Sequence, residues 1–260
     1  MKTAFMRRHN MFTRAFIEQK GNGKLGCEEQ LLASELSARG ISITLFTVKK
    51  IQRRQLALSR ETFIAGGMDV MHGAMQQLGI EVPQPADYPD SLQPYLRRRI
   101  WKSTLGVIEQ RILDGDSAPV FVKPAERRKN FTGRIFATID DFRVIGDVSR
   151  RQPVWCSEVV AWASEYRVYV VKHEIGAVKH YGGDTAITPD LQVIEAALAA
   201  YRAAGSAPAA YGIDFGVLAT GETALVEAND GYSLGAYELS GVIYTDLLLT
   251  RWAELISTIK

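Results

Sequence analysis

Two apolar runs near the end of the chain, residues 211–218 and 224–231, constrain its folding more than any other feature. A short polar segment that contains Gly221 separates them. Two apolar runs around a glycine-bearing turn predict a β-hairpin. The hairpin also limits which side chains lie together, because neighbouring side chains along a strand point to opposite faces.

Three side chains with oxygen atoms lie on the predicted hairpin. Glu227 and Asn229 are two positions apart and share one face of their strand. With the turn centred near residues 221 and 222, the residue opposite Glu227 lies at about position 215 to 217, which leaves Asp214 diagonal to the pair. Two carboxylates and one amide oxygen suit a hard cation such as magnesium. An ordinary surface hairpin with polar ends explains the same spacing equally well.

The composition is that of an ordinary globular protein, with 47% hydrophobic and 23% charged residues among 260. Its 31 basic and 29 acidic side chains leave a net charge of +2, which by itself does not indicate a nucleic-acid partner. No apolar run approaches the roughly 18 residues of a membrane span, and the start of the chain lacks the apolar region of a signal peptide. Cys27 and Cys156 provide no disulfide framework. We therefore expect a cytoplasmic protein.

The first part of the chain alternates strand-like and helix-like patterns, which favours a small parallel sheet with helices on its faces. The expected strands are residues 14–18, 41–48 and 62–67, and the expected helices are residues 26–40, 52–58 and 68–78. Residues 82–90 contain three prolines and are predicted to be a linker. We expect residues 1–90 to form one α/β domain.

The pattern changes after this linker and indicates a second architectural unit. We expect a helix over residues 92–113 that carries three consecutive arginines. Further strands are expected at residues 120–124, 154–160, 166–171 and 177–181, and further helices over residues 188–205 and 235–259.

Four segments of this second unit resemble, in chain order, the motifs of the ATP-grasp superfamily, which includes D-alanine:D-alanine ligase and glutathione synthetase. They are Val120-Phe-Val-Lys-Pro124, Cys156-Ser-Glu-Val-Val160, Ser164-Glu-Tyr-Arg-Val168, and Asp214 with Glu227-Ala-Asn229. Glu165-Tyr-Arg167 and Lys129-Asn-Phe-Thr-Gly133 are more closely similar to an ATP-grasp clade named for two arginines and a lysine.

The resemblance implies a small parallel α/β domain followed by a two-lobed ATP-grasp fold with antiparallel sheets. The expected lobes are residues 91–155 and residues 156–260. ATP and magnesium are the ligands that the resemblance implies, with the cation held by Asp214, Glu227 and Asn229.

Three residues are implied to bind the phosphates of ATP. Lys123 would neutralise the α- and β-phosphates as a point charge, and an ordinary surface lysine is the alternative. Thr132 and Gly133 would cover the phosphates, because glycine lets backbone N–H groups approach the oxygens closely. A simple hairpin turn fits these two residues equally well.

The implied adenine site is the stretch Glu158, Val159 and Val160, which offers apolar side chains and backbone hydrogen-bonding groups. A buried strand without a ligand is the alternative. Glu165 lies seven positions after Glu158 (165 − 158 = 7). This interval is similar to that of the ligases, in which the second acid accepts hydrogen bonds from the ribose hydroxyls.

Two arginines are implied to act on the reacting groups. Arg167 would bind a phosphate or the substrate carboxylate through paired hydrogen bonds, and a salt bridge on the outer face is the alternative. Arg134 would be the second basic clamp, although Lys129 or Lys179 would serve as well.

The resemblance implies an ADP-forming ligase that joins a carboxylate to an amine through an acylphosphate. The expected partners are ATP and the two substrates, an amino acid or a peptide among them, and a homodimer is left open. We expect neither a membrane nor a nucleic acid as partner. Residues 230–235 depart from the Asn-x-x-Pro-Gly turn of the ligases, so the substrates stay open.

Two functions of other classes are alternatives. One is a nucleotide-binding module without turnover. The other is an interaction domain that uses Arg97–Arg99 and Arg127–Lys129 as a basic contact patch, whose affinity for its partner falls steeply with salt. The sequence contains no zinc spacing of histidines, no Gly-x-Ser-x-Gly elbow and no Walker-type run.

Overall fold

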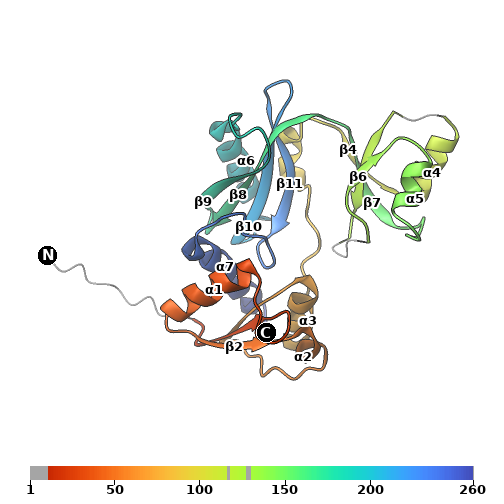
Figure 1. Ribbon diagram of the computed structural model, residues 1–260. Helices are drawn as coiled ribbons and strands as arrows, with labels where there is room; N and C mark the ends of the chain where they lie inside the picture. The colour runs from red at the N-terminus through yellow and green to blue at the C-terminus, as the bar shows by residue number, and fades with distance from the viewer. Residues whose placement is uncertain (1–10, 116–117, 127–129, 260) are drawn as a thin grey trace.

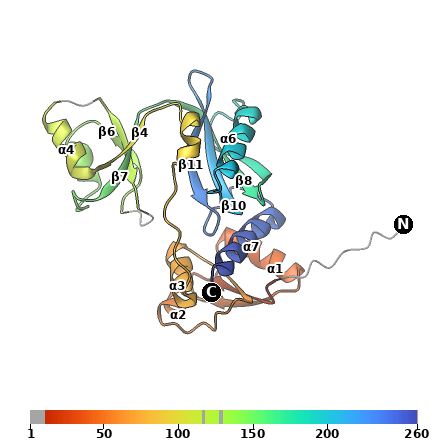
Figure 2. The same cartoon turned by 180° about the vertical axis from the view of Figure 1, so that it is seen from behind.

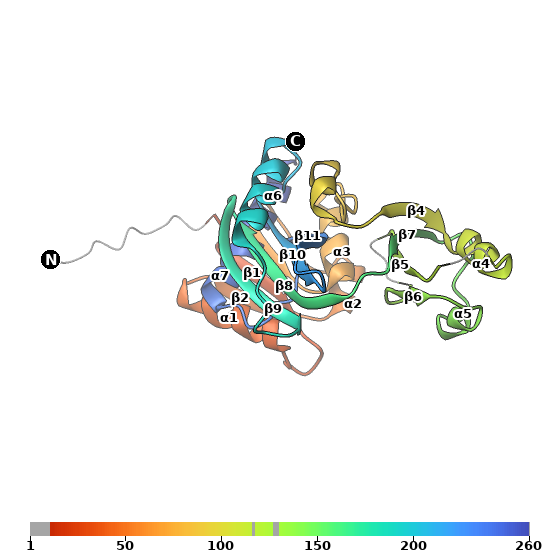
Figure 3. The ribbon, with the colours of Figure 1, turned by 90° about the horizontal axis from the view of Figure 1, so that it is seen from above.

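The computed structural model describes residues 11–115, 118–126 and 130–259. Along the chain, one small parallel sheet is followed by two antiparallel sheets (Figure 1). This arrangement confirms the predicted fold class. The sheet formed by the strands from β4 (Ile100–Thr104) to β7 (Pro153–Glu158) stands apart from the rest of the molecule, to which extended segments connect it (Figures 1 and 3).

The first unit is the predicted β-α-β-α-β-α alternation. Its three parallel strands lie in the order β2-β1-β3 and are β1 (Arg14–Glu18), β2 (Ser42–Phe46) and β3 (Thr62–Ala65). The helices are α1 (Cys27–Ala38), α2 (Val48–Gln52) and α3 (Met68–Leu78). The helix predicted over residues 52–58 is wrong, because α2 begins directly after β2 and Arg54, with a φ of 53°, turns the chain away from helical geometry.

The first antiparallel sheet, called here the β4–β7 sheet, has the strand order β4-β7-β5-β6. Its strands are β4 (Ile100–Thr104), β5 (Val120–Pro124), β6 (Arg134–Phe136) and β7 (Pro153–Glu158). Helices α4 (Leu105–Leu113) and α5 (Asp140–Val144) lie on the side of this sheet that faces away from the other sheets (Figure 3). The opposite face is therefore left open toward the rest of the molecule.

The predicted helix over residues 92–113 is wrong, since the structure divides this stretch into three elements. A 3₁₀ helix, η1 (Asp90–Tyr95), comes first and is followed by β4 and α4. Pro94 lacks the N–H that an α-helix needs, and Arg97 has a φ of 52°. The triple arginine therefore lies on the connection into β4 and not on a helix.

The second antiparallel sheet, called here the β8–β11 sheet, has the strand order β11-β10-β8-β9. Its strands are β8 (Trp162–Val171), β9 (Glu174–Gly183), β10 (Ala210–Leu218) and β11 (Thr223–Asp230). Helix α6 (Leu191–Ala203) covers one face and buries an apolar core with side chains such as Val168, Ile213 and Leu198 (Figure 3). The polar residues of the predicted site lie on the other face.

The last helix, α7 (Gly241–Ser257), packs against α1 of the first unit (Figure 2). Its side chains share one core with the parallel sheet, Trp252 donates a hydrogen bond to the Thr62 carbonyl at 2.9 Å, and Arg39 of α1 pairs with Asp246 at 2.5 Å. The helix begins later than the predicted residue 235 because Tyr237 and Glu238 have positive φ. The predicted division into residues 1–90, 91–155 and 156–260 stays a prediction.

Among the described residues, no helix has the length and apolar character that crossing a membrane requires.

The two cysteines differ in environment, and thiol labelling tests the packing of the β4–β7 sheet. Burial raises the pKa of the Cys156 thiol to about 12, whereas Cys27 is exposed at the start of α1. The thiolate is the reactive form of cysteine. In the Cys27→Ser variant, we therefore expect a thiol reagent to leave Cys156 unmodified while the protein is folded and to modify it once urea unfolds the protein. Rapid labelling of Cys156 in the folded variant would contradict this packing.

Candidate active site

The register of the β10–β11 hairpin places Asp214 directly opposite Glu227 and Gly212 opposite Asn229. The prediction that a residue at 215–217 faces Glu227 is therefore wrong. The cause is a bulge: Phe215 pairs with Leu225 and Asp214 with Glu227, so Val226 is an extra residue in the ladder. The carboxylates are direct and not diagonal neighbours.

The bulge also decides which side chains of β11 face the site. Leu225 and Ala228, three positions apart, both lie in the core beneath α6, while Glu227 and Asn229 face the opposite side. Two carbonyls at the bulge accept hydrogen bonds from Arg98: Leu225 O at 2.6 Å and Val226 O at 3.0 Å. A half-buried arginine thus supports the bulge where the regular ladder is interrupted.

This role bears on the basic contact patch that the sequence suggested. Arg98 is half-buried and lies 5.2 Å from the Trp162 ring, and burial lowers its pKa. Its guanidinium is engaged by the two bulge carbonyls. Arg127–Lys129, the other half of the predicted patch, lie outside the described residues.

Arg167, Asp214 and Glu227 form one row across three neighbouring strands, and Lys179 of β9 continues it. Arg167 donates to both oxygens of Asp214, from Nε and from Nη2, each at 2.7 Å. Only 9% of the Arg167 side chain and 3% of the Asp214 side chain are exposed. Burial raises the pKa of the Asp214 carboxyl group, and the ion pair with Arg167 opposes this rise.

The three predicted metal residues lie together. The Asn229 Nδ2 atom is 3.2 Å from Glu227 Oε1 and 3.4 Å from Asp214 Oδ2. Among the described residues, no group of three or more His, Cys, Asp or Glu is placed to hold a metal ion. The trio itself offers two carboxylates and one amide. Magnesium usually takes one or two carboxylates together with substrate phosphates and water. Glu227 and Asn229 fit that incomplete set once the Asn229 amide turns its oxygen toward the cation.

Lys123 lies at the centre of the site because β5 alternates. Val120 and Val122 are buried under α4, which leaves Phe121 and Lys123 on the open face. Lys123 Nζ is 2.5 Å from Glu227 Oε2 and 2.8 Å from Asp87 Oδ2. Burial disfavours the charged amine, but Glu227, Tyr88 and Asp87 outweigh burial, and the pKa of Lys123 is raised.

Asp87 and Tyr88 are site residues that the sequence did not reveal. Both lie in the segment predicted as a linker, and Tyr88 places its ring 4.5 Å from Lys123 Nζ. A proline-rich stretch carries no pattern that indicates a site. Their position depends on a contact between segments far apart in the chain, because the Asp87 carbonyl accepts the Ala228 N–H of β11 at 2.8 Å.

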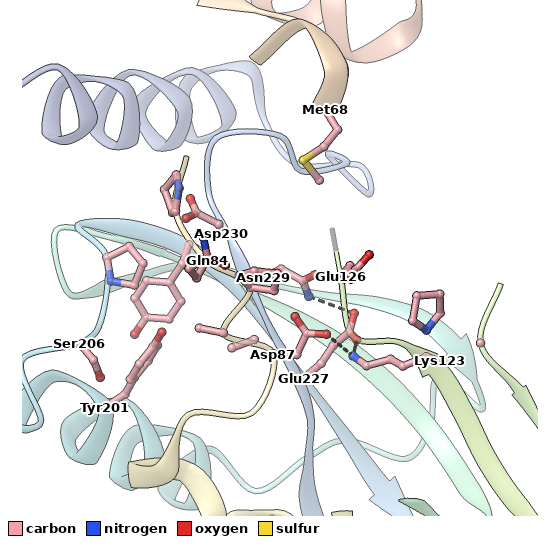
Figure 4. A pocket seen from close by; sticks show the side chains of 18 of the residues that line it. Met68, Gln84, Asp87, Lys123, Glu126, Tyr201, Ser206, Glu227, Asn229 and Asp230 are labelled. Carbon is pink, nitrogen blue, oxygen red and sulfur yellow. Dashed lines mark hydrogen bonds and ion pairs between the residues drawn. The ribbon is translucent and has the colours of Figure 1, made fainter. Parts of the chain in front are cut away.

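A cavity of about 460 Å³ lies between the two antiparallel sheets and brings together seven predicted residues. They are Lys123, Arg134, Glu158, Val159, Val160, Glu165 and Glu227. A second cavity of about 440 Å³ shares Lys123 and Glu227 with the first and is also lined by Thr132, Gly133 and Asn229 (Figure 4). Lys123 and Glu227 therefore lie where the two cavities meet. Arg167 and Asp214 line neither of these two cavities.

The first cavity is lined in part by the apolar side chains of Val159, Val160 and Trp162. Strand β7 ends at Glu158, so Val159 and Val160 belong to the connection into β8 and not to the predicted strand. Val159 is 41% exposed. Glu165 accepts a hydrogen bond from the Tyr181 hydroxyl at 3.2 Å, which orients its carboxylate.

Arg134 on β6 and Gly133, which precedes it, are tightly packed beside Lys123 and the first cavity. The Nε atom of Arg134 is buried without a hydrogen-bond partner among the described residues, in a side chain that lines the first cavity. A Cβ atom on Gly133 would lie 2.8 Å from the Phe121 ring and 3.0 Å from Lys123 Cβ. Only glycine fits this close approach to Lys123 without rearrangement.

A family model described as ATP-grasp domain, R2K clade family 2, matches residues 95–247, which is more than half of the chain. The chain belongs to the R2K clade of the ATP-grasp superfamily. This R2K protein has no match among curated proteins.

Solved structures with the same fold include a D-alanine–D-alanine ligase and a macrocyclase. D-alanine–D-alanine ligase from Bacillus anthracis, complexed with ATP, is 14% identical with a TM-score of 0.53 and covers 94% of this chain and 99% of its own. The macrocyclase MdnC from Microcystis aeruginosa, bound with precursor peptide MdnA, is 12% identical with a TM-score of 0.51 and covers 90% and 99%. At these sequence identities, the two comparisons show that the R2K protein shares the fold of these structures.

The Arg167–Asp214 pair gives a stability prediction. Replacing Arg167 by Met leaves a buried carboxylate without its partner, and we expect a loss of about 3–5 kcal/mol in the free energy of unfolding, measured in urea. Lys179→Met, in the same row of the sheet but more exposed, is the matched control and should change stability by about 0.5 kcal/mol or less. Similar small losses in both variants would show that the pair is not a major source of stability.

Proposed function

We propose that this ATP-grasp protein is a magnesium-ATP-dependent carboxylate–amine ligase that releases ADP. The observation that carries the proposal is that Lys123 and Glu227 lie at the junction of two cavities, with Asn229 beside Glu227. One cavity has the size and lining for a nucleotide. The other leaves room for a second substrate next to the same groups.

In this proposal the nucleotide occupies the first cavity. Adenine lies against Glu158, Val159 and Val160, and the ribose hydroxyls donate to Glu165. The phosphates then extend toward Lys123, which exchanges a carboxylate partner for phosphate oxygens. Arg134 approaches from β6, where its buried Nε has no partner among the described residues and suits an anionic ligand.

Glu227 and Asn229 are proposed to hold the magnesium ion together with phosphate oxygens. The ion would offset the charge of the β- and γ-phosphates. Asp214 is the third member of the proposed set, and direct binding requires one of its oxygens to exchange Arg167 for the cation. Arg167 released in this way could donate to the transferred phosphate or to the substrate carboxylate.

The proposed reaction has two steps. A substrate carboxylate oxygen attacks the γ-phosphorus, the bond to the ADP oxygen breaks, and an acylphosphate forms. The amine nitrogen then attacks the acyl carbon, inorganic phosphate leaves, and the nitrogen loses a proton to give the amide. Thr132 and Gly133, of which Gly133 lies close to Lys123, are proposed to exclude water from the acylphosphate.

The substrates are proposed by class. MdnC is bound with a precursor peptide, and we propose an amino acid or a peptide as a substrate of this protein. A cytoplasmic location belongs to the same proposal, because Cys27 and Cys156 are both free thiols.

The direct test measures nucleotide binding at millimolar magnesium and then ADP release with a panel of amino acids and dipeptides. Lys123→Met removes the proposed phosphate-binding charge, and we expect nucleotide affinity to fall by about tenfold to a hundredfold, the equivalent of one strong charged hydrogen bond. Lys24→Met, a change of the same kind at an exposed position, should leave affinity unchanged. Wild-type protein that binds no nucleotide would refute the proposal.

A further inference from the structure

Residues 83–89, called here the strap, run beside the outer edge of β11. The Asp87 carbonyl accepts the Ala228 N–H at 2.8 Å, so the strap is held directly between the two proposed magnesium ligands, Glu227 and Asn229. Three prolines within the strap restrict its backbone. The strap therefore presents its side chains from a stiff and anchored backbone.

The side chains of the strap reach the opposite sheet. Asp87 Oδ2 lies 2.8 Å from Lys123 Nζ on β5. The Tyr88 ring lies 4.5 Å from the same nitrogen and packs edge-on against Trp155 of β7, with ring centroids 5.0 Å apart. Asp87 thus connects the strand that carries the proposed metal ligands to the lysine that faces the phosphates.

Lys123 has two carboxylate partners, and one of them has another proposed task. Glu227 binds Lys123 at 2.5 Å in this structure, whereas binding of magnesium-ATP requires Glu227 to face the cation. We propose that Asp87 is a positioning residue that remains the counterion of Lys123 and so frees Glu227 for magnesium. This inference rests on the proposed binding of magnesium-ATP.

Removing the Asp87 charge weakens magnesium binding through two physical effects. Lys123 would pair with Glu227 alone and compete more strongly with magnesium for that carboxylate. The cation would also lose the attraction of one nearby negative charge. A nucleotide without magnesium is an anion, so loss of Asp87 should leave its affinity equal or higher. Loss of the Asp87 charge should therefore weaken binding of the nucleotide with magnesium but not binding of the nucleotide without magnesium.

The test compares fluorescent nucleotide binding in EDTA and during a magnesium titration. For Asp87→Asn we expect the magnesium concentration at half-saturation to rise about threefold to tenfold, and affinity in EDTA not to fall. Asp87→Glu should restore most of the magnesium response. Asp90→Asn, an exposed acid on the adjoining η1, removes the same charge away from Lys123 and should behave as wild type.

Two results would overturn the inference while the proposed function stands: an unchanged magnesium requirement in Asp87→Asn, or an affinity loss in EDTA as large as that in magnesium. The second result would mark Asp87 as merely structural. Asp87→Ser provides a second variant for the same comparison should Asp87→Asn fail to fold. Wild-type protein that binds no nucleotide in either condition would instead overturn the proposed function and this inference with it.

Discussion

The arrangement of the site depends on one extra residue, Val226, in strand β11. In an uninterrupted strand Leu225 and Glu227 would share a face. The bulge separates them, so that Leu225 enters the core beneath α6 while Glu227 stays opposite Asp214. The carbonyls at the bulge are bound by Arg98, which lies 127 positions before Leu225. The connection into β4 thus stabilises the geometry of a hairpin much later in the chain.

The charges of the site are paired before any ligand arrives. Lys123 is bound by Asp87 and Glu227, and Arg167 by Asp214. Buried or half-buried charges without partners would be costly, and these pairs avoid that cost in the structure described here. A ligand that enters such a site exchanges partners with groups that are already ordered. The proposed binding of magnesium-ATP is an exchange of this kind.

The first unit and α7 together support the loop that borders the predicted site. Helix α7 shares its core with the parallel sheet, and the loop that leads into it places Tyr237 4.8 Å from the Arg167 guanidinium. Tyr237 also stacks on Tyr181, whose hydroxyl binds Glu165. The first unit therefore supports the loop next to the predicted site, although none of its strands carries a predicted site residue.

Local patterns in the sequence determined most elements and the facing of several site residues. The alternation of β5 put Lys123 on the face opposite Val120 and Val122, and the hairpin motif put Glu227 and Asn229 on one face, because period-two alternation needs only neighbouring residues. The helix expected over residues 92–113 failed because Pro94 and the positive φ of Arg97 interrupt it.

Only the tertiary structure decided the register of the hairpin and the partners of the charged groups. The bulge at Val226 shifts Asp214 directly opposite Glu227, and no local pattern announces it. Asp87 reaches Lys123, and Arg98 reaches Leu225, across long stretches of chain. Such contacts follow from how separately formed sheets pack together, which depends on the whole core and not on the residues beside each group.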